Sequence, residues 1–241
     1  MSFSNPSIFP RTSINRGFDP SSISGLIGWW DADDPTTITE VADAVSQLDD
    51  KSGEGNHVTQ GTGTEQPLTN TNTIGGKNTI TFDGVNDNLK RTTFTGGAIS
   101  QPNTIFIVAN LKDVETTGTN YMVDGGSSSR HTFNTPNGAN RLNQYAGSHN
   151  TALSGQTNGS ALYTLIYDTT SSELRKNSSV QVSGDVGTRV MSGVTLGATY
   201  VGSVPGNFDL GEILIYDGLV SETDITAIEG YLNPKWGSDT W

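Results

Sequence analysis

Residues 161–241 read ALYTLIYDTTSSELRKNSSVQVSGDVGTRVMSGVTLGATYVGSVPGNFDLGEILIYDGLVSETDITAIEGYLNPKWGSDTW. Short runs of apolar and β-branched residues alternate there with clusters of Gly, Ser, Asn and Asp. Strand-sized runs at this spacing, each bounded by turn residues, are typical of an antiparallel sandwich of two β-sheets. The stretch therefore predicts an all-β fold, in which recognition residues lie on loops and on a concave sheet face.

The same pattern extends toward the N-terminus. Residues 24–31 (SGLIGWWD) predict an aromatic-rich strand, and residues 79–82 (TITF) alternate as a half-buried strand does. Three continuous apolar runs predict central strands that are covered on both faces. These runs are residues 104–109 (TIFIVA), 162–167 (LYTLIY) and 213–216 (ILIY).

One short helix is expected near the C-terminus. Ser221, followed three residues later by Asp224, has the pattern of a capping box. The apolar residues that follow fall on one helical face: Ile225, Ile228 and Leu232. Pro234 is expected to end this helix, which should pack against the sandwich.

The first 20 residues differ in character from the rest of the chain. They are rich in Ser, Asn, Pro and Arg, and Pro6, Pro10 and Pro20 oppose a regular helix or a central strand. We predict an extended arm over residues 1–20, held by another subunit or folded back on its own domain. Residues 21–241 have a suitable length for one large β-sandwich domain.

The charge and the composition exclude several classes of function. The net charge is −12, and basic residues are never clustered beyond a pair such as Lys90-Arg91. Nucleic-acid binding requires the opposite sign, so DNA and RNA are rejected as partners. The chain has no cysteine, which excludes disulfides and thiolate chemistry. No segment resembles a signal peptide or a membrane span, so we expect no membrane insertion.

Recognition residues are sought between residues 112 and 160, where the chain becomes rich in Gly, Ser, Thr and Asn. Aromatic rings can stack on sugar rings or on partner side chains, and Asn, Arg and His can orient a ligand. The alternative is that the tyrosines lie in the core and the polar residues are solvated. The candidate ligand-binding residues are Tyr121, Arg130, His131, Arg141, Asn143, Tyr145 and His149.

Two acidic clusters have the oxygen-rich composition that calcium prefers. They are Asp31, Asp33 and Asp34, and Asp83, Asn86 and Asp87. Both clusters are equally typical of turns, in which carboxylates accept hydrogen bonds from backbone amides. Calcium is therefore the one candidate cofactor, and the metal ligands stay unassigned. The histidines show no spacing of metal ligands.

Six segments, in this order, resemble the concanavalin A-like lectin/glucanase superfamily and specifically its laminin-G-like branch, common in phage and bacterial proteins. They are residues 24–34 (SGLIGWWDADD), 50–57 (DKSGEGNH), 82–87 (FDGVND), 194–198 (VTLGA), 211–217 (GEILIYD) and 228–237 (IEGYLNPKWG). The resemblance covers roughly residues 21–237. It implies a jelly roll that often binds sugar or protein, frequently with calcium. Asn177-Ser178 and Asn88 depart from the family pattern without affecting the fold.

The glucanase members of that superfamily place alternating acids, Glu-x-Asp-x-Glu, on one strand. This chain lacks that spacing, and Glu212 is the only acid within its apolar run. A solitary carboxylate cannot serve both as nucleophile and as acid. We therefore predict that the protein is not an enzyme, and that Glu212 is bonded to a neighbouring turn.

These expectations combine into one functional hypothesis. The chain is interpreted as a structural protein of a tailed-phage virion: a capsid decoration, a head fibre or a tail-associated adhesin. It would be made in the host cytoplasm without a signal peptide and displayed on the particle surface. Its arm would bind other virion proteins or further copies of itself in a homo-oligomer, and its lectin-like face would bind surface polysaccharide. The alternatives are a bacterial carbohydrate-binding or adhesion module and, third, a glycan-cleaving enzyme.

Overall fold

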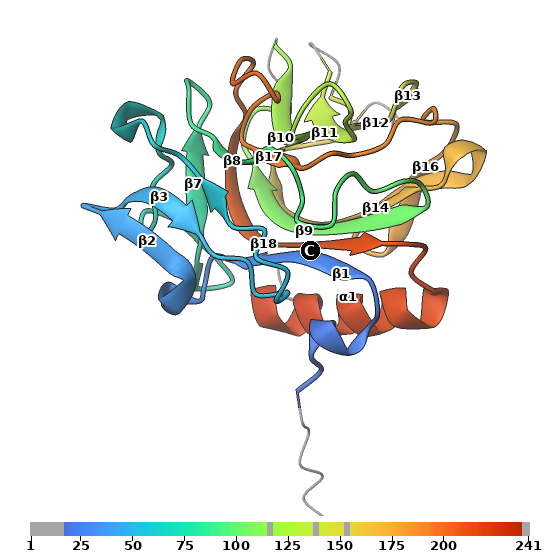
Figure 1. The fold of residues 1–241 in the computed structure, drawn as a ribbon, viewed down its shortest axis with the longest axis horizontal. Coiled ribbons are helices and arrows are strands. Elements are labelled where there is room, and N and C mark those ends of the chain that lie inside the picture. The colour runs from blue at the N-terminus through green and yellow to red at the C-terminus, as the bar shows by residue number, and fades with distance from the viewer. Residues whose placement is uncertain (1–16, 115–117, 137–139, 152–154, 238–241) are drawn as a thin grey trace, which may run out of the picture.

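The computed structural model describes residues 17–114, 118–136, 140–151 and 155–237. Most of the predicted arm, residues 1–16, lies outside these ranges. Within them the chain forms two antiparallel sheets packed face to face, with helix α1 (Glu222–Trp236) beneath the smaller sheet (Figure 1). The predicted all-β sandwich with a C-terminal helix is confirmed. Among the described residues, no helix combines the length and the apolar character needed to cross a bilayer.

The smaller sheet contains the three apolar runs noted in the sequence, and they form its centre. Strand β7 (Ile80–Asp83) pairs with β18 beside the main path of this sheet. The path runs β1 (Leu26–Asp31), β18 (Asn207–Asp217), β9 (Asn103–Leu111), β14 (Gly159–Tyr167), β15 (Ser172–Lys176) and β16 (Ser179–Gly184).

The larger sheet consists of shorter strands. A separate hairpin, β5 (Thr73–Ile74) and β6 (Lys77–Asn78), lies outside both sheets. The strand order of the larger sheet is β13 (His149–Thr151), β12 (Asn143–Tyr145), β11 (Thr132–Thr135), β10 (Asn120–Gly125), β17 (Val194–Leu196), β8 (Leu89–Arg91), β4 (Val58–Thr59), β3 (Ala44–Leu48) and β2 (Ile38–Val41).

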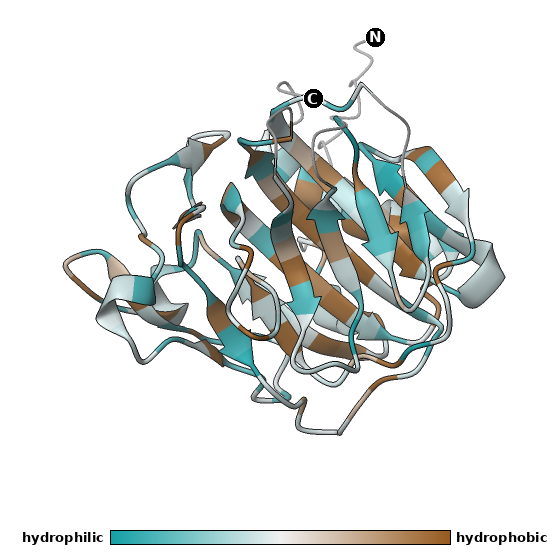
Figure 2. Cartoon of the chain, turned by 90° about the horizontal axis from the view of Figure 1, so that it is seen from above, coloured by the Kyte–Doolittle hydropathy of each residue, from teal (hydrophilic) through white to brown (hydrophobic). Residues whose placement is uncertain are grey.

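The apolar side chains form two layers, one on each face of the smaller sheet. Along β9, Ile105 and Ile107 face the larger sheet, whereas Phe106 and Val108 face α1. This alternation explains why the central strands carry apolar residues at consecutive positions, because both of their faces are covered. Figure 2 shows the hydrophobic colour continuing along the inner strands.

Helix α1 begins as predicted but does not end at Pro234. Ser221 Oγ accepts a hydrogen bond from the Asp224 amide at 3.2 Å, and the helix continues to Trp236 before Gly237 closes it with φ +102°. The fully buried Trp236 indole packs where a Cβ on Gly211 would approach its ring within 2.9 Å. This packing holds the last turn in place, so the loss of one backbone donor at Pro234 is tolerated.

The side chain of Glu212 joins the helix to the sheet. Its carboxylate accepts hydrogen bonds from Trp29 Nε1, Lys235 Nζ and Trp236 Nε1, each at 2.7 Å, and from Tyr231 Oη at 2.9 Å. The expected partner, a neighbouring turn, is therefore wrong: the donors lie on β1 and α1. A buried carboxylate requires several donors, and the aromatic-rich sequences around it supply them.

The described chain enters the domain on the side of the helix. Pro20 begins a short 3₁₀ turn that Asp19 caps, and the Pro20 carbonyl accepts a hydrogen bond from Tyr216 Oη at 3.0 Å. The Phe18 ring packs on Tyr231 of α1 with ring centroids 6.0 Å apart. Residues 17–22 are therefore anchored beneath the smaller sheet, away from the outer face of the larger one (Figure 1).

Candidate functional site

The outer face of the larger sheet is the candidate binding face. Helix α1 covers the corresponding face of the smaller sheet, and no helix in the described ranges covers this one. A polar row crosses it because residues paired in register point to the same side of a sheet. From β3 to β10 this row is Gln47, Thr59, Lys90, Thr195 and Asp124.

Asp124, at one end of the polar row, is fully buried and fixes two parts of the face. Its Oδ2 accepts hydrogen bonds from Arg130 Nη1 and from the Tyr200 amide, both at 2.9 Å. Loss of hydration raises the pKa of Asp124 to about 6, although these donors act in the opposite direction. The carboxylate thus holds the Arg130 guanidinium and the loop around Tyr200 together.

Arg130 lies between two tyrosine rings. Its guanidinium carbon is 5.7 Å from the Tyr145 ring centroid and 5.2 Å from that of Tyr200, and Arg189 lies 5.5 Å from Tyr145. These are cation–π distances, which stabilise both the cations and the orientation of the rings. We call Arg130, Tyr145, Arg189 and Tyr200 the tyrosine–arginine cluster.

Three other predicted residues lie next to this cluster. Burial raises the pKa of Tyr121, with Arg130 near enough to oppose the shift. Asn143 Nδ2 lies 2.8 Å from His149 Nδ1, and the His149 ring lies 4.8 Å from Tyr145. The structure therefore brings Tyr121, Arg130, Tyr145 and His149 together on one face, and Asn143, which is buried, supports them from β12.

The other two predicted residues lie elsewhere. His131 is fully buried, stacked on Tyr167 at 4.3 Å, and its Nε2 lies 2.7 Å from the Arg189 carbonyl. Burial lowers the pKa of His131 to about 4. Arg141 is exposed just before β12. His131 thus supports the cluster from behind through the backbone of Arg189, without reaching the surface.

The sequence reasoning missed Asp124, Arg189 and Tyr200. Asp124 follows an apolar pair and gives no local sign of its partner. Tyr200 lies in a Gly/Ser/Pro turn after β17 and is the one of the three with a usable signal, an aromatic residue in a turn sequence. Because Tyr200 is far from Arg130 in the sequence, no local pattern predicted the contact between them.

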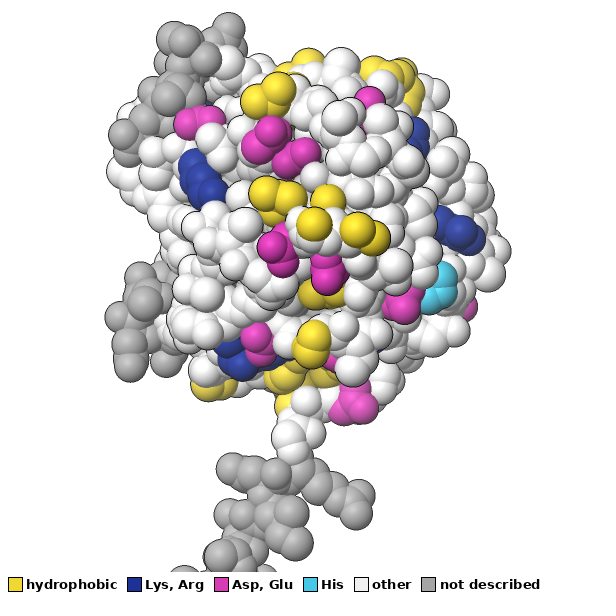
Figure 3. Space-filling model, turned by 90° about the vertical axis from the view of Figure 1, so that its left-hand side faces the viewer, with side chains coloured by type: hydrophobic (Ala, Val, Ile, Leu, Met, Phe, Trp, Pro, Cys, Tyr) yellow, Lys and Arg dark blue, Asp and Glu magenta, His cyan; other side chains and the backbone are white. Residues whose placement is uncertain are grey.

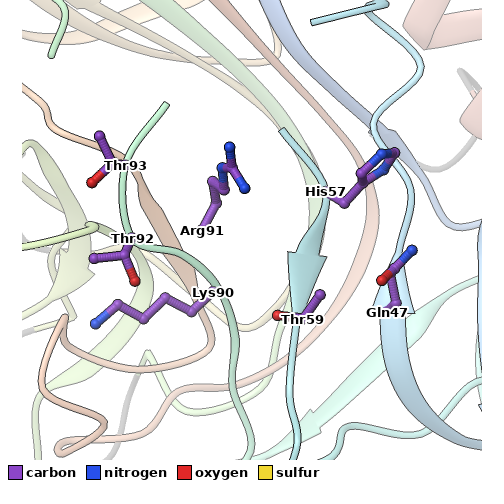
Figure 4. A pocket seen from close by; sticks show the side chains of 7 residues that line it. All are labelled: Gln47, His57, Thr59, Lys90, Arg91, Thr92 and Thr93. Carbon is purple, nitrogen blue, oxygen red and sulfur yellow. The ribbon is translucent and has the colours of Figure 1, made fainter. Parts of the chain in front are cut away.

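A groove continues the face beyond Tyr200. Its volume is about 520 Å³, and Lys90 Nζ, at its border, donates a hydrogen bond to the Tyr200 carbonyl. Figure 4 shows the Arg91 guanidinium between the Thr92–Thr93 segment and His57, with Lys90 extending away from Thr59. The residues that line the groove are Gln47, His57, Thr59, Lys90, Arg91, Thr92 and Thr93.

The first candidate calcium cluster is occupied by lysine ammonium groups. Asp31 Oδ2 lies 3.0 Å from Lys51 and 2.7 Å from Lys235. Asp34 pairs with Lys51 at 2.8 Å, and this hydrogen bond lowers the pKa of Asp34 to about 2. Asp33 pairs in the same way with Lys77. These cations neutralise the carboxylates, so the cluster does not fit a calcium site.

The second candidate cluster forms a turn. Asp83 Oδ1 accepts a hydrogen bond from the Val85 amide at 2.7 Å, and Asp87 Oδ2 accepts one from the Asp83 amide at 2.9 Å. Burial raises the pKa of Asp87 to about 6. In the described part of the chain, no three acidic or histidine side chains are grouped to hold a metal ion.

Comparison with known proteins identifies the fold. No family model matches the chain, and no curated protein matches it in sequence. Among solved structures, the ligand-binding domain of botulinum neurotoxin serotype D in complex with N-acetylneuraminic acid aligns with a TM-score of 0.62 and 13% identity. This alignment covers 88% of the chain and 52% of the toxin domain.

Two further structures align over similar stretches. Trypanosoma rangeli sialidase in complex with sialic acid has a TM-score of 0.59 at 10% identity, over 90% of this chain and 34% of the sialidase. The binding domain of Paraclostridial Mosquitocidal Protein 1 has a TM-score of 0.60 at 14% identity, over 89% of this chain and 54% of that one. The chain thus spans about a third to a half of these structures and shares a β-sandwich fold with the aligned parts.

Proposed function

We propose that this chain is a non-enzymatic glycan-binding module that holds surface polysaccharide on the outer face of its larger sheet. The observation that carries the proposal is the position of Arg130, fixed by buried Asp124 at 2.9 Å between the rings of Tyr145 and Tyr200. Both rings are half-buried, so each is held rigidly and keeps an accessible edge or face.

The chemistry of the tyrosine–arginine cluster suits a sugar. Rigid aromatic faces stack on the apolar face of a pyranose ring with little loss of conformational entropy. Guanidinium donors orient hydroxyl groups, and Arg130 is pre-positioned by its carboxylate, which lowers the entropic cost of binding. Farther along the polar row, Gln47 and Thr59 are at least partly exposed and offer amide and hydroxyl partners to a polymer.

The comparisons support this proposal at the level of the fold. The toxin domain and the sialidase were both solved in complex with a sialic acid, which supports testing sugars as the ligand class of this chain. Membership of the laminin-G-like branch is part of the proposal and rests on the six ordered sequence segments. Fold alone does not determine function, and the cluster itself therefore carries the argument.

We assign no hydrolysis to this face. Glycoside hydrolysis by paired carboxyls needs two acids flanking the bond. The groove is lined by seven residues, none of them acidic, and Asp124 is buried and bonded to Arg130 and Tyr200. A third role, glycan cleavage, would be revealed by release of reducing ends from a polysaccharide panel.

Display on a phage particle stays a prediction from the sequence, with a bacterial adhesion module as its alternative. Under this proposal the N-terminal segment tethers the domain to a virion protein or to a sister copy. Deleting residues 2–16 should then release the domain from particles while leaving glycan binding intact. Undiminished association of the deletion variant with particles would contradict the tether.

The binding proposal is tested on an array of neutral, sialylated and uronic-acid glycans. Tyr145→Ala and Tyr200→Ala should each weaken binding about tenfold or more, since stacked rings contribute substantially to ligand contact. Val201→Ala is the matched control, because Val201 is 66% exposed in the same loop as Tyr200. Equal binding by all variants, or binding to no glycan, would overturn the proposal.

A further inference from the structure

Lys90 and Arg91 differ from most cations of this acidic protein. The lysines and arginines that form ion pairs are Lys51, Lys77, Lys112, Arg130, Arg175 and Lys235. Lys90 and Arg91 have no carboxylate partner among the described residues, and both line the same groove. Two adjacent cations without counter-charge stand out in a chain of net charge −12.

The donors of these two side chains are only partly used. Lys90 Nζ donates to the Tyr200 carbonyl, a neutral acceptor, and an ammonium group has three donors. Arg91 Nε is buried and has no hydrogen-bond partner in the described structure. Within the described ranges its guanidinium group makes one hydrogen bond, a long one of 3.4 Å from Arg91 Nη2 to Thr95 Oγ1. The terminal guanidinium nitrogens therefore have few protein acceptors, and an anionic acceptor can form strong, charge-assisted hydrogen bonds with them.

Asp49, which contacts the groove residues Gln47 and His57, does not neutralise the pair. Asp49 Oδ1 accepts from Gln47 Nε2 at 2.7 Å and lies 2.9 Å from His57 Nδ1. These two contacts hold the Asp49 carboxylate at the opposite wall of the groove, on the side of β3. The groove therefore has a cationic wall at β8 and a neutral, hydroxyl- and amide-rich wall at Gln47 and Thr59 (Figure 4).

We infer that this groove binds an acidic sugar unit, whose carboxylate or sulfate is held by Arg91 and Lys90 while its hydroxyl groups meet Thr59 and Gln47. The inference rests on the proposed glycan-binding function and assigns it a ligand class. A planar guanidinium matches the two oxygens of such a group, and the volume of about 520 Å³ lies in the usual range for a small-molecule site. The Lys90–Tyr200 hydrogen bond makes the groove continuous with the tyrosine–arginine cluster.

A sugar polymer fits this charge distribution better than a nucleic acid does. Acidic side chains are spread over the side of the molecule at β2 and β3, with Lys and Arg toward the edges of that view (Figure 3). A nucleic acid carries closely spaced phosphates. Beyond Lys90 and Arg91, these phosphates would be repelled by the acidic side chains. A polysaccharide carries its charges farther apart, so one acidic unit can occupy the groove while neutral parts cross the rest of the face.

The test is a calorimetric titration of the full chain with hexagalacturonate and with its fully methyl-esterified form, in which every carboxylate is replaced by a neutral methyl ester. Dextran sulfate and dextran oligosaccharides form a second pair that separates sulfate from carboxylate. We expect at least one acidic probe to bind about tenfold or more tightly than its neutral partner, with the preference falling as NaCl rises. Arg91→Gln and Lys90→Gln should each remove most of that preference.

The matched controls separate local charge from net charge. Lys176→Gln removes one positive charge on β15, outside the groove, and should leave the preference unchanged. Arg91→Lys keeps the positive charge and should retain part of the preference for the acidic probe. Thermal unfolding of each variant checks that it is folded. The inference is overturned if the acidic and neutral probes bind equally, or if the preference survives both Arg91→Gln and Lys90→Gln. In either case the proposed function stands.

Two further outcomes are decisive. Tighter binding of a single-stranded oligothymidylate than of either acidic sugar overturns the ligand class in favour of nucleic acid. Binding of no probe, acidic or neutral, overturns the proposed function together with this inference.

Discussion

The buried carboxylate of Asp124 holds the guanidinium of Arg130 at 2.9 Å on the outer face of the larger sheet. One residue lies on β10 and the other precedes β11, so a hairpin brings them together. The pair orders the surface around it, because the same carboxylate oxygen accepts the Tyr200 amide and the same guanidinium contacts Tyr145. A carboxylate that cannot reach water thereby positions the side chains that can.

Asp124 should make the stability of the domain fall as pH rises. Its pKa in the folded protein, about 6, lies above the ordinary value of 3.8, so the folded state binds the proton more tightly than the unfolded chain does. The stabilisation by protonated Asp124 is present at about pH 4 and is lost as pH approaches and passes 6. Relative to Asp124→Asn, the wild-type free energy of unfolding should decrease by up to about 3 kcal/mol over that range. Urea unfolding at several pH values measures it, and parallel curves for the two proteins would contradict the prediction.

His131 should stay neutral well into the acid range. Burial lowers its folded pKa to about 4 from 6.5, so its contribution to stability is complete above pH 6.5 and is lost as pH falls toward 4. The corresponding loss is about 3 kcal/mol. Nuclear magnetic resonance of the imidazole nitrogens across this pH range reports the protonation directly. A His131 ring that is already charged at pH 6 would show that the site is open to water.

Glu212→Gln should destabilise the domain strongly. The substitution leaves Lys235 with a single carboxylate partner, Asp31, and replaces an acceptor of four hydrogen bonds by an amide that also donates. Breaking a buried ion pair typically costs about 3–5 kcal/mol, and we expect a loss of about 3 kcal/mol. Tryptophan fluorescence during urea unfolding measures it, because the indoles of Trp29 and Trp236 both donate to this carboxylate. Glu173→Gln, on β15, is a part-exposed control and should change stability by less than about 1 kcal/mol.

Ile228→Ala should weaken the attachment of α1 to the smaller sheet. Ile228 is fully buried in the apolar layer between them, so truncation removes contacts and leaves a cavity. Such substitutions cost about 2–5 kcal/mol. Thr226→Ala, exposed on the same helix, is the control and should have an effect near zero. Equal unfolding midpoints for the two variants would show that the helix contributes little to the fold.

The sequence predicted the architecture well because local patterns determine it. The three apolar runs became the central strands β9, β14 and β18, since consecutive apolar residues are typical of strands covered on both faces. The capping pattern at Ser221 located the start of α1. The end of α1 could not be read locally, because it depends on the packing of Trp236 against Gly211, a contact between distant parts of the chain.

The site was predicted only in part for the same reason. Side-chain type identified Tyr145 and Arg130, which do meet on one face. Residue type alone could not distinguish these two residues from His131, whose side chain is buried in the core. It also could not reveal Tyr200, which lies in a turn far along the sequence but contacts Arg130 in the fold. Which side chains converge depends on strand order, and strand order is not encoded in any one segment.

The contact between Phe18 and Tyr231 makes the two sides of the domain different, because it anchors the start of the described chain on the side of α1. Residues 17–22 lie on the side of α1, opposite the outer face of the larger sheet. If several copies were attached side by side through this end of the domain, their larger sheets would all face away from the point of attachment. Weak individual contacts with a repeating polymer would then combine into tighter overall binding.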